Sequence, residues 1–273
     1  MRQNLKTCQL KVMLMWMGMT LPLFAPGLAL AETRETQTMQ HVADAVQPQD
    51  WVILDLDNTL MQPAQTLGSD QWFGYRIQVG LEQGLSLKDA LAGALGPWWQ
   101  IQFKTGVKPM ESMTAGWIQE MQAKGITVMG LTARAVDLAA TSHAQLASLG
   151  IDLARTPPVR ESKTLEASDY QNGVLYLRDL GDKGAALMDF LVSTDSHPES
   201  VIFVDDKMSN VRSVEKVLEG TSIRHLSFRY GAADATVARF NSRLADIQYR
   251  EFVEKGILIS DEVGLALLEA AHE

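Results

Sequence analysis

Two aspartates separated by one residue follow an apolar run in the stretch WVILDLDNTL, residues 51–60. Side chains alternate along a strand, so Asp55 and Asp57 leave it pointing in about the same direction, while Leu56 returns to the core. Burying a charge is costly unless that charge is paired, bound to a metal or placed at the edge of the core. We therefore expect these carboxylates, with the Thr59 hydroxyl nearby, to stand at a strand end that uses them for chemistry.

A second acidic pair, Asp205 and Asp206, follows the apolar run VIFV. Four converging carboxylates without a cation would repel one another strongly or be forced to take up protons. A divalent cation removes this conflict, and a solvent-facing set of oxygen ligands favours Mg²⁺ over zinc. None of the five histidines has the spacing of a zinc-binding pair. Lys183 and Arg134 can supply further positive charge to the same site.

The strands that would carry these groups alternate with amphipathic stretches, which is the pattern of β-α-β units and a parallel sheet. We expect strands at residues 51–56, 126–131, 201–204 and 223–228. The first three end in the polar clusters DLDNT, TAR and DDK. Ligands of open parallel sheets bind at the carboxyl ends of the strands, so these three clusters predict one shared site.

The interval between the first two strands is too long for one crossover helix. Its excess, residues 62–108, is helix-like, with Ser86 as an N-cap before LKDALAGAL and a break at Gly96-Pro97. We interpret it as an inserted helical cap over the site. Residues 32–61 and 109–273 then form the core of an α/β fold.

Three smaller expectations concern the rest of the core. Residues 32–50 are polar and are expected to be a loose lead-in. Asn172-Gly173 within YQNGVLYL predicts a β-hairpin turn. Two closing helices are expected after residue 231, within DATVARFNSRLADIQYREFVEKG and SDEVGLALLEAA.

Residues 1–31 have the layout of a secretory signal peptide, with a basic start, an apolar run and the small-x-small end Ala29-Leu30-Ala31. The alternative is an uncleaved membrane anchor. We expect cleavage after Ala31 and a periplasmic or secreted protein that leaves the membrane. The single cysteine, Cys8, lies in this segment, so the mature chain would have no thiol. It would carry 21 basic against 33 acidic residues, which argues against general binding to nucleic acid or anionic membranes.

Taken together, the polar clusters resemble the four motifs of the haloacid dehalogenase (HAD) superfamily. The motifs are DLDNT, the Thr132 of VMGLTAR, the Lys183 of GDKGAAL, and VIFVDDKMSNV, in that order over about residues 51–230. Within the superfamily the sequence is most similar to a group of exported bacterial HAD-like proteins. The resemblance implies a Rossmann-like core with a mainly parallel sheet and a helical cap inserted between the first and second motifs.

The resemblance also implies catalytic roles. Asp55 would attack phosphorus and form an aspartyl-phosphate, which splits hydrolysis into two easier steps. Asp57 would protonate the leaving oxygen and then activate water. Thr132 and Lys183 would hold the non-bridging phosphate oxygens, whose charge must be stabilised in the transition state. Arg134 is expected either to join them as a substrate-binding residue or to be a surface charge.

For the metal, the resemblance implies Mg²⁺ bound by the Asp55 carboxylate, the Asp57 backbone carbonyl and an acid of the fourth motif. Aligning that motif places Asp206 on the metal, with Asp205 behind it or bound through water. Asn210 stands where the family often has a later acid, and it can still orient a metal-bound water.

Each residue also has a plainer interpretation. Asp55 and Asp57 alone could form a turn, Thr132 could cap a helix, and Lys183 could be a solvated helix residue. The aromatic residues of the insert could stack on a substrate or form the core of the insert; they are Trp72, Phe73, Tyr75, Trp98, Trp99 and Phe103.

The function we expect is an exported Mg²⁺-dependent phosphomonoesterase acting on a small phosphorylated molecule. Phosphotransfer to an alcohol in place of water is one alternative. A non-catalytic binding or host-interaction protein that retains the HAD fold is another. The sequence leaves the oligomeric state open.

Overall fold

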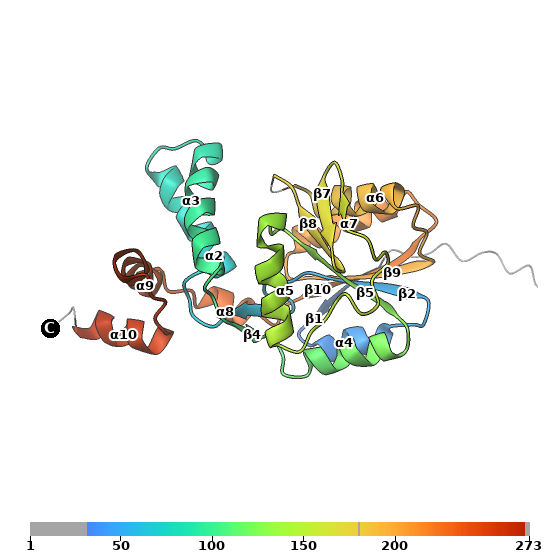
Figure 1. Ribbon diagram of the computed structural model, residues 1–273, viewed down its shortest axis with the longest axis horizontal. Helices are drawn as coiled ribbons and strands as arrows, with labels where there is room; N and C mark the ends of the chain where they lie inside the picture. Colours follow the sequence, from blue (N-terminus) through green and yellow to red (C-terminus); the bar gives the residue numbers. More distant parts are fainter. Residues whose placement is uncertain (1–31, 180, 271–273) are drawn as a thin grey trace, which may run out of the picture.

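A computed structural model describes residues 32–179 and 181–270 (Figure 1). The expected signal peptide, residues 1–31 with Cys8, lies outside this part of the chain. Within the described ranges, every helix is too short or too polar to cross a membrane.

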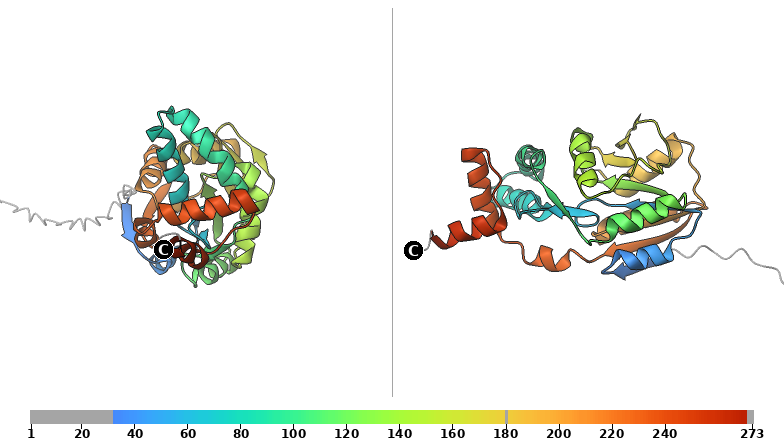
Figure 2. Two further views of the ribbon diagram at one scale, coloured as in Figure 1. Left: turned by 90° about the vertical axis from the view of Figure 1, so that its left-hand side faces the viewer. Right: turned by 60° about the horizontal axis from the view of Figure 1, so that its bottom comes forward.

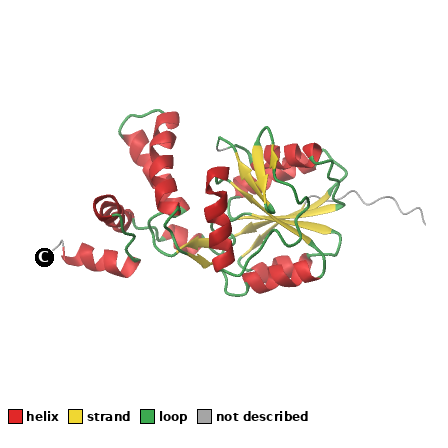
Figure 3. Cartoon of the chain, viewed as in Figure 1, coloured by secondary structure: helices red, strands yellow, loops and turns green. Residues whose placement is uncertain are grey.

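The centre of the fold is an eight-stranded sheet (Figure 3). Its strands, in spatial order, are β1 (Glu32–Thr36), β10 (Arg224–Tyr230), β9 (Ser200–Asp205), β2 (Asp50–Leu54), β5 (Thr127–Thr132), β8 (Val174–Leu177), β7 (Ser168–Gln171) and β6 (Lys163–Thr164). Neighbours from β1 to β8 are parallel, and β8, β7 and β6 are antiparallel. The four strands predicted from the sequence are confirmed, as is the mainly parallel, Rossmann-like α/β class.

Helices cover both faces of the sheet, which explains the continuous apolar runs in the central strands. Val52 and Leu54 of β2 face one core, which also contains residues of α1 (Met39–Ala45), α4 (Thr114–Ala123) and α5 (Ala139–Ser148). Ile53 faces the opposite core, with α6 (Lys183–Ser193) and α7 (Met208–Leu218). A short 3₁₀ turn, η1 (Val136–Leu138), precedes α5.

The predicted hairpin between β7 and β8 is confirmed. Asn172 and Gly173 have φ angles of 47° and 82°, the left-handed conformations that a two-residue hairpin turn requires. Gly173 is also pressed against the chain, because a Cβ built on it would lie 2.1 Å from the Leu153 carbonyl oxygen.

The expectation of a loose lead-in at residues 32–50 is wrong, because this segment forms β1 and α1. Strand β1 pairs in parallel with β10, in register from Glu32 opposite Leu226 to Thr36 opposite Tyr230. Four of its five residues are exposed, as in an edge strand held by backbone hydrogen bonds. Its polar sequence therefore lacks the apolar signal that marks the central strands.

A second, helical unit lies beyond the carboxyl ends of the parallel strands. It contains α2 (Asp70–Glu82) and α3 (Leu87–Gln102), joined to the sheet through the antiparallel ribbon of β3 (Met61–Pro63) and β4 (Val107–Pro109). The C-terminal helices α9 (Ser242–Lys255) and α10 (Asp261–Ala270) lie at the same end of the molecule (Figure 2).

Contacts between these segments make the helical unit one body. Ala245 of α9 packs in the same cluster as Trp72 of α2 and Ile101 of α3. The Leu67 backbone N–H donates to the Gln248 side-chain oxygen at 2.9 Å. Residues 242–270 thus pack on the helical insert, although all of residues 109–273 were expected to belong to the core.

Two helix boundaries also differ from expectation. The predicted break at Gly96-Pro97 is wrong, because α3 continues through Pro97. The buried side chains of Trp98 and Ile101 lie beyond the proline, and their packing offsets the backbone hydrogen bond that proline cannot donate. The expected helix after residue 231 is divided into α8 (Asp234–Ala238) and α9, because Asn241 caps α9 by accepting from the Leu244 N–H.

The Gly173 turn leads to a stability prediction with a matched control. Gly84 has a similar φ of 84°, but no atom lies near the position of its missing Cβ. Gly84→Ala should therefore cost only the left-handed strain, about 1 kcal/mol. Gly173→Ala should cost at least about 2 kcal/mol, because the new methyl group also meets the Leu153 carbonyl. Urea unfolding of both variants measures the difference, and equal costs would contradict the close approach.

Candidate active site

Three carboxylates meet where two neighbouring parallel strands end. Asp55 directly follows β2, and Asp205 and Asp206 lie at the end of β9. The Asp55 N–H donates to the Val204 carbonyl at 2.9 Å, which fixes the relative position of the two strand ends. Asp55, Asp205 and Asp206 each place a carboxylate oxygen within 4.8 Å of the other two. Three of the four carboxylates that the sequence predicted to converge at the sheet edge therefore do so, and they form a three-carboxylate cluster.

Lys183 binds the cluster from a third segment of the chain. It is the first residue of α6, whose N-cap Asp182 accepts from the Ala185 N–H at 2.8 Å. Its ammonium lies 2.5 Å from Asp55 Oδ1 and 2.7 Å from Asp205 Oδ2, with the side chain only 2% exposed. The structure therefore brings Lys183 into the cluster and not to a solvated helix face.

The electrostatics of the cluster are unbalanced. Burial raises the pKa of Asp55 well above its usual range, and Lys183 opposes this shift only in part. Burial, together with the neighbouring Asp205, raises the pKa of Asp206 to about 7. Burial alone would lower the pKa of Lys183, but Asp205 and Asp55 outweigh it and raise that pKa. Lys207 also acts on Asp206, but it is paired with a further acid, Asp70, at 2.8 Å. The two ammonium groups thus do not compensate the acids around them, and the oxygen-only set suits a hard divalent cation.

Smaller contacts orient the acids. The Thr59 hydroxyl donates to Asp55 Oδ2 at 3.2 Å, and the Asn58 amide donates to Asp206 Oδ2 at 3.2 Å. Asn210, in the first turn of α7, donates to both Asp205 oxygens at 3.0 and 3.1 Å. Asn210 therefore lies beside the cluster, where its amide group holds Asp205.

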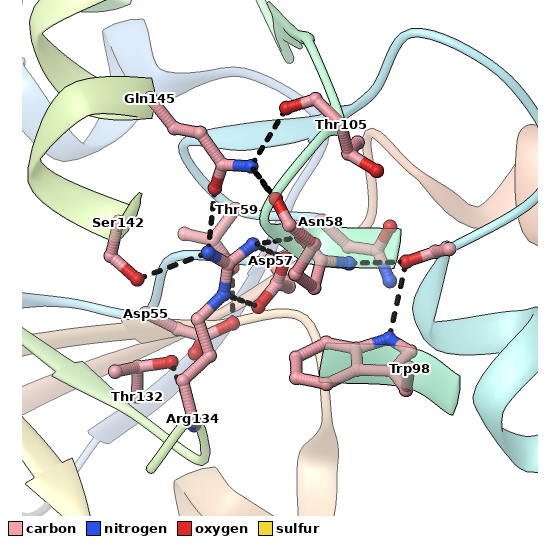
Figure 4. Close-up of polar contacts among 12 residues, drawn as sticks. Asp55, Asp57, Asn58, Thr59, Trp98, Thr105, Thr132, Arg134, Ser142 and Gln145 are labelled. Carbon is pink, nitrogen blue, oxygen red and sulfur yellow. Dashed lines mark hydrogen bonds and ion pairs between the residues drawn. The ribbon is translucent and has the colours of Figure 1, made fainter. Parts of the chain in front are cut away.

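Asp57 does not belong to the three-carboxylate cluster, because its carboxylate turns toward Arg134 (Figure 4). Arg134 Nε and Nη2 lie 2.7 Å from the two Asp57 oxygens in a bidentate pair, a strong and strictly oriented contact. The remaining guanidinium N–H groups donate to Ser142 at 3.0 Å, Gln145 at 2.7 Å and Gln102 at 3.4 Å.

These contacts define the position of Arg134 closely. The side chain is buried, so it is not a surface charge, and its five N–H groups all point at protein oxygens. The other expectation, a contact with a substrate phosphate, stays a prediction, because here the guanidinium holds Asp57. Thr132, at the end of β5, is buried nearby and accepts from the Arg134 backbone N–H at 3.2 Å (Figure 4).

Several site residues were not singled out in the sequence. Gln102 at the end of α3 and Gln145 on α5 join the Arg134 network. Asp70, at the start of α2, pairs with Lys207 beside the acidic cluster at 2.8 Å. Glutamines inside helices have no distinctive spacing, so only the folded chain reveals these partners.

A cavity of about 480 Å³ lies between the helical unit and this edge of the sheet. Asp57 and Arg134 line it, whereas the three carboxylates of the cluster do not. Part of its wall comes from the aromatic residues of α2 and α3.

A known protein family includes this site. Residues 35–264 match the model of a family described as "Protein of unknown function (DUF2608)". The chain belongs to this family. The matched span of the DUF2608 family contains both cores and every residue of the site described above.

Relatives of similar length occur in Chlamydia. A Chlamydia pneumoniae protein named "Putative outer membrane protein" is 27% identical over 223 residues, which are 82% of this chain and 84% of the relative. Proteins of the same name from Chlamydia muridarum and Chlamydia trachomatis are each 27% identical and cover 80% of this chain, with 82% and 81% of their own lengths matched.

The unbalanced charge of the cluster leads to a metal-binding prediction. At 100 times its dissociation constant, Mg²⁺ should stabilise the protein by about 2.7 kcal/mol, measured as a rise in Tm that EDTA reverses. Asp206→Asn should lose this rise. Without metal, the variant should melt above the wild type at pH 8, because it removes a carboxylate whose charged form is disfavoured by burial and by the neighbouring Asp205.

Asp195→Asn is the matched control, because the Asp195 side chain is 95% exposed and lies outside the cluster. It should retain the full Mg²⁺ response. A response of Asp206→Asn equal to that of the wild type would contradict a metal at this cluster.

Proposed function

We propose that this protein is a Mg²⁺-dependent phosphomonoesterase of the HAD type, acting through an aspartyl-phosphate on Asp55. The observation that carries the proposal is the Lys183 ammonium, which contacts Asp55 and Asp205 together at 2.5 and 2.7 Å. With Asp206 beside them and Asp57 two residues after Asp55, these groups have the chemistry that the resemblance implies. A protein that only binds ligands would not need Asp57 as a proton donor.

The residues present fit a divalent cation. Three carboxylates lie together, Lys183 contacts two of them, and burial with the neighbouring acids raises the pKa values of Asp55 and Asp206. Asp55 and Asp206 would hold Mg²⁺, with the Asp57 backbone carbonyl as the resemblance implies. Asp205, engaged by Lys183 and Asn210, would support them from behind. When bound, the cation would offset the negative charge of the phosphoryl group.

In the first step, an Asp55 oxygen would form a bond to phosphorus while the bond to the leaving oxygen breaks. Lys183 and Thr132 would stabilise the charge on the non-bridging oxygens. Asp57 would give a proton to the leaving oxygen. In the second step, Asp57 would take a proton from water as the water attacks the aspartyl-phosphate, which releases phosphate and restores Asp55.

Arg134 would act as a positioning residue for Asp57. Both Asp57 oxygens accept from the guanidinium, so one must be released before Asp57 can carry a proton. Substrate entry beside Asp57 would loosen this pair, and the Ser142 and Gln145 contacts would keep Arg134 in place.

We further propose that α2 and α3 act as the cap of this enzyme. Two contacts join this hairpin to the reactive edge: Asp70 with Lys207 at 2.8 Å, and Gln102 with Arg134 at 3.4 Å. A partly open cavity of about 480 Å³ favours a small phosphorylated substrate over a phosphoprotein.

Activity measurements test the proposal directly. Purified protein with Mg²⁺ should hydrolyse p-nitrophenyl phosphate and small alkyl phosphates, and Asp55→Asn should reduce both rates to background. Asp57→Asn should lower kcat for an alkyl phosphate by about 10²- to 10⁴-fold. Its effect on p-nitrophenyl phosphate should be smaller, because nitrophenolate leaves without a proton.

Asp44→Asn, on the exposed face of α1, serves as the control and should retain wild-type rates. If wild type and Asp55→Asn behave alike across a broad phosphoester panel, the protein is not this enzyme, and a ligand-binding role replaces the proposal. Appearance of a phosphorylated alcohol when alcohols are added would identify phosphotransfer.

We also propose that the protein is exported, because residues 1–31 have a signal-peptide pattern and the Chlamydia relatives carry "outer membrane protein" in their names. Cleavage after Ala31 would leave the whole of β1 on the mature chain. Intact-mass measurement of the exported protein should find an N-terminus at Glu32. A chain that still begins at Met1 would contradict cleavage.

A further inference from the structure

The cavity beside Asp57 is lined by aromatic side chains of the helical unit and by two charged residues of the site. These charged residues are Asp57 and Arg134, whereas Asp55, Asp205 and Asp206 do not line the cavity. Under the proposed function, the phosphoryl group lies at the carboxylate cluster and Asp57 protonates the leaving oxygen. The leaving group must then extend past Asp57, into this cavity.

The aromatic wall is continuous with the packed core of the helical unit, because Trp98 belongs to that core and Phe73 and Trp99 pack against it. Trp72 is fully buried in that core, whereas Phe73 and Trp99 are only partly buried and line the cavity. Leu95 adds aliphatic surface to the same cavity. Partly buried rings on a cavity wall leave apolar area that a bound ring can cover.

Trp98 gives this wall a rigid centre. Its indole N–H donates to the Gly68 carbonyl at 3.2 Å (Figure 4), and its ring lies 5.7 Å from that of Phe73. The Arg134 guanidinium lies over the Trp98 ring, with its central carbon 5.8 Å from the ring centroid. A ring held by these contacts loses little conformational freedom when a ligand stacks nearby.

We propose that the cavity binds a planar aromatic leaving group, so that the substrates are nucleoside monophosphates or phosphomonoesters of similar aromatic alcohols. This inference rests on the proposed function for the position of the phosphate. Stacking of one base on an aromatic side chain favours binding by roughly 5- to 150-fold.

The charge of the cavity restricts the substrate further. The exposed carboxylates of Asp137 and Asp179 lie on its wall, beside an Asp169 that is already paired with Arg178. Exposed carboxylates can accept hydrogen bonds from the exocyclic amine of a base, and they repel a second or third phosphate. The cavity therefore favours monophosphates over di- and triphosphates.

Adenosine 5′-monophosphate and ribose 5-phosphate test the proposal, because they share the ribose and its reacting 5′-phosphate, and the sugar phosphate has a hydroxyl group in place of the base. The wild-type kcat/KM for the nucleotide should exceed that for the sugar phosphate by at least tenfold. Trp99→Leu, which keeps apolar bulk but removes the ring, should reduce this ratio at least fivefold, and Phe73→Leu should do the same. Phe103→Ala is the control, because Phe103 is an exposed aromatic residue that does not line this cavity, and it should leave the ratio unchanged.

A binding measurement separates this inference from the proposed function. In calorimetry with Asp55→Asn, adenosine 5′-monophosphate should bind at least tenfold more tightly than ribose 5-phosphate, and Trp99→Leu should remove the difference. Base-dependent binding without hydrolysis would support the aromatic cavity and overturn the enzyme. Two results would overturn the inferred aromatic binding alone. One is hydrolysis of both compounds with kcat/KM values within threefold of each other, and the other is a ratio of these two kcat/KM values that Trp99→Leu leaves unchanged. Absence of both binding and hydrolysis would overturn both.

Discussion

The site depends on one buried ammonium shared between two carboxylates. Lys183 lies within 2.7 Å of both Asp55 and Asp205, and these three residues come from α6, the end of β2 and the end of β9. A buried acid without a partner would be costly, so this contact ties the three segments at the sheet edge. It also leaves the cluster negative once Asp206 is included, and that remaining charge makes the site suited to a cation.

A second buried cation organises the other half of the site. Arg134 faces Asp57 with one edge of its guanidinium and uses the rest on Ser142, Gln145 and Gln102. The sheet, α5 and the helical unit therefore meet at a single side chain. Since the planar group fits its partners in one orientation, a shift of α3 or α5 would be transmitted to the Asp57 carboxylate.

The helical unit is built from two distant parts of the sequence. The hairpin of α2 and α3 is carried on the ribbon of β3 and β4, and α9 packs against it from the C-terminal end of the chain. This packing explains how a small insertion obtains a core of its own while leaving Phe73 and Trp99 at the cavity. The cavity thus lies where the helical unit meets the α/β part, and Leu138 of η1 joins the two because it packs in the core of the helical unit.

The sequence alone determined the features that depend on neighbouring residues. Apolar runs identified β2, β5, β9 and β10, Asn172-Gly173 identified the hairpin, and Ser86 identified the start of α3, because strand burial, turn geometry and capping are local. The order of the acidic motifs and Lys183 also anticipated their convergence, since parallel strands bring their carboxyl ends to one edge.

Only the tertiary structure decided the rest. Four features depend on contacts between residues far apart in the chain. They are the pairing of polar β1 with β10, the continuation of α3 through Pro97, the docking of α9 and the partners of Arg134. Their energies come from burial and from hydrogen bonds across the fold, which local sequence patterns do not encode.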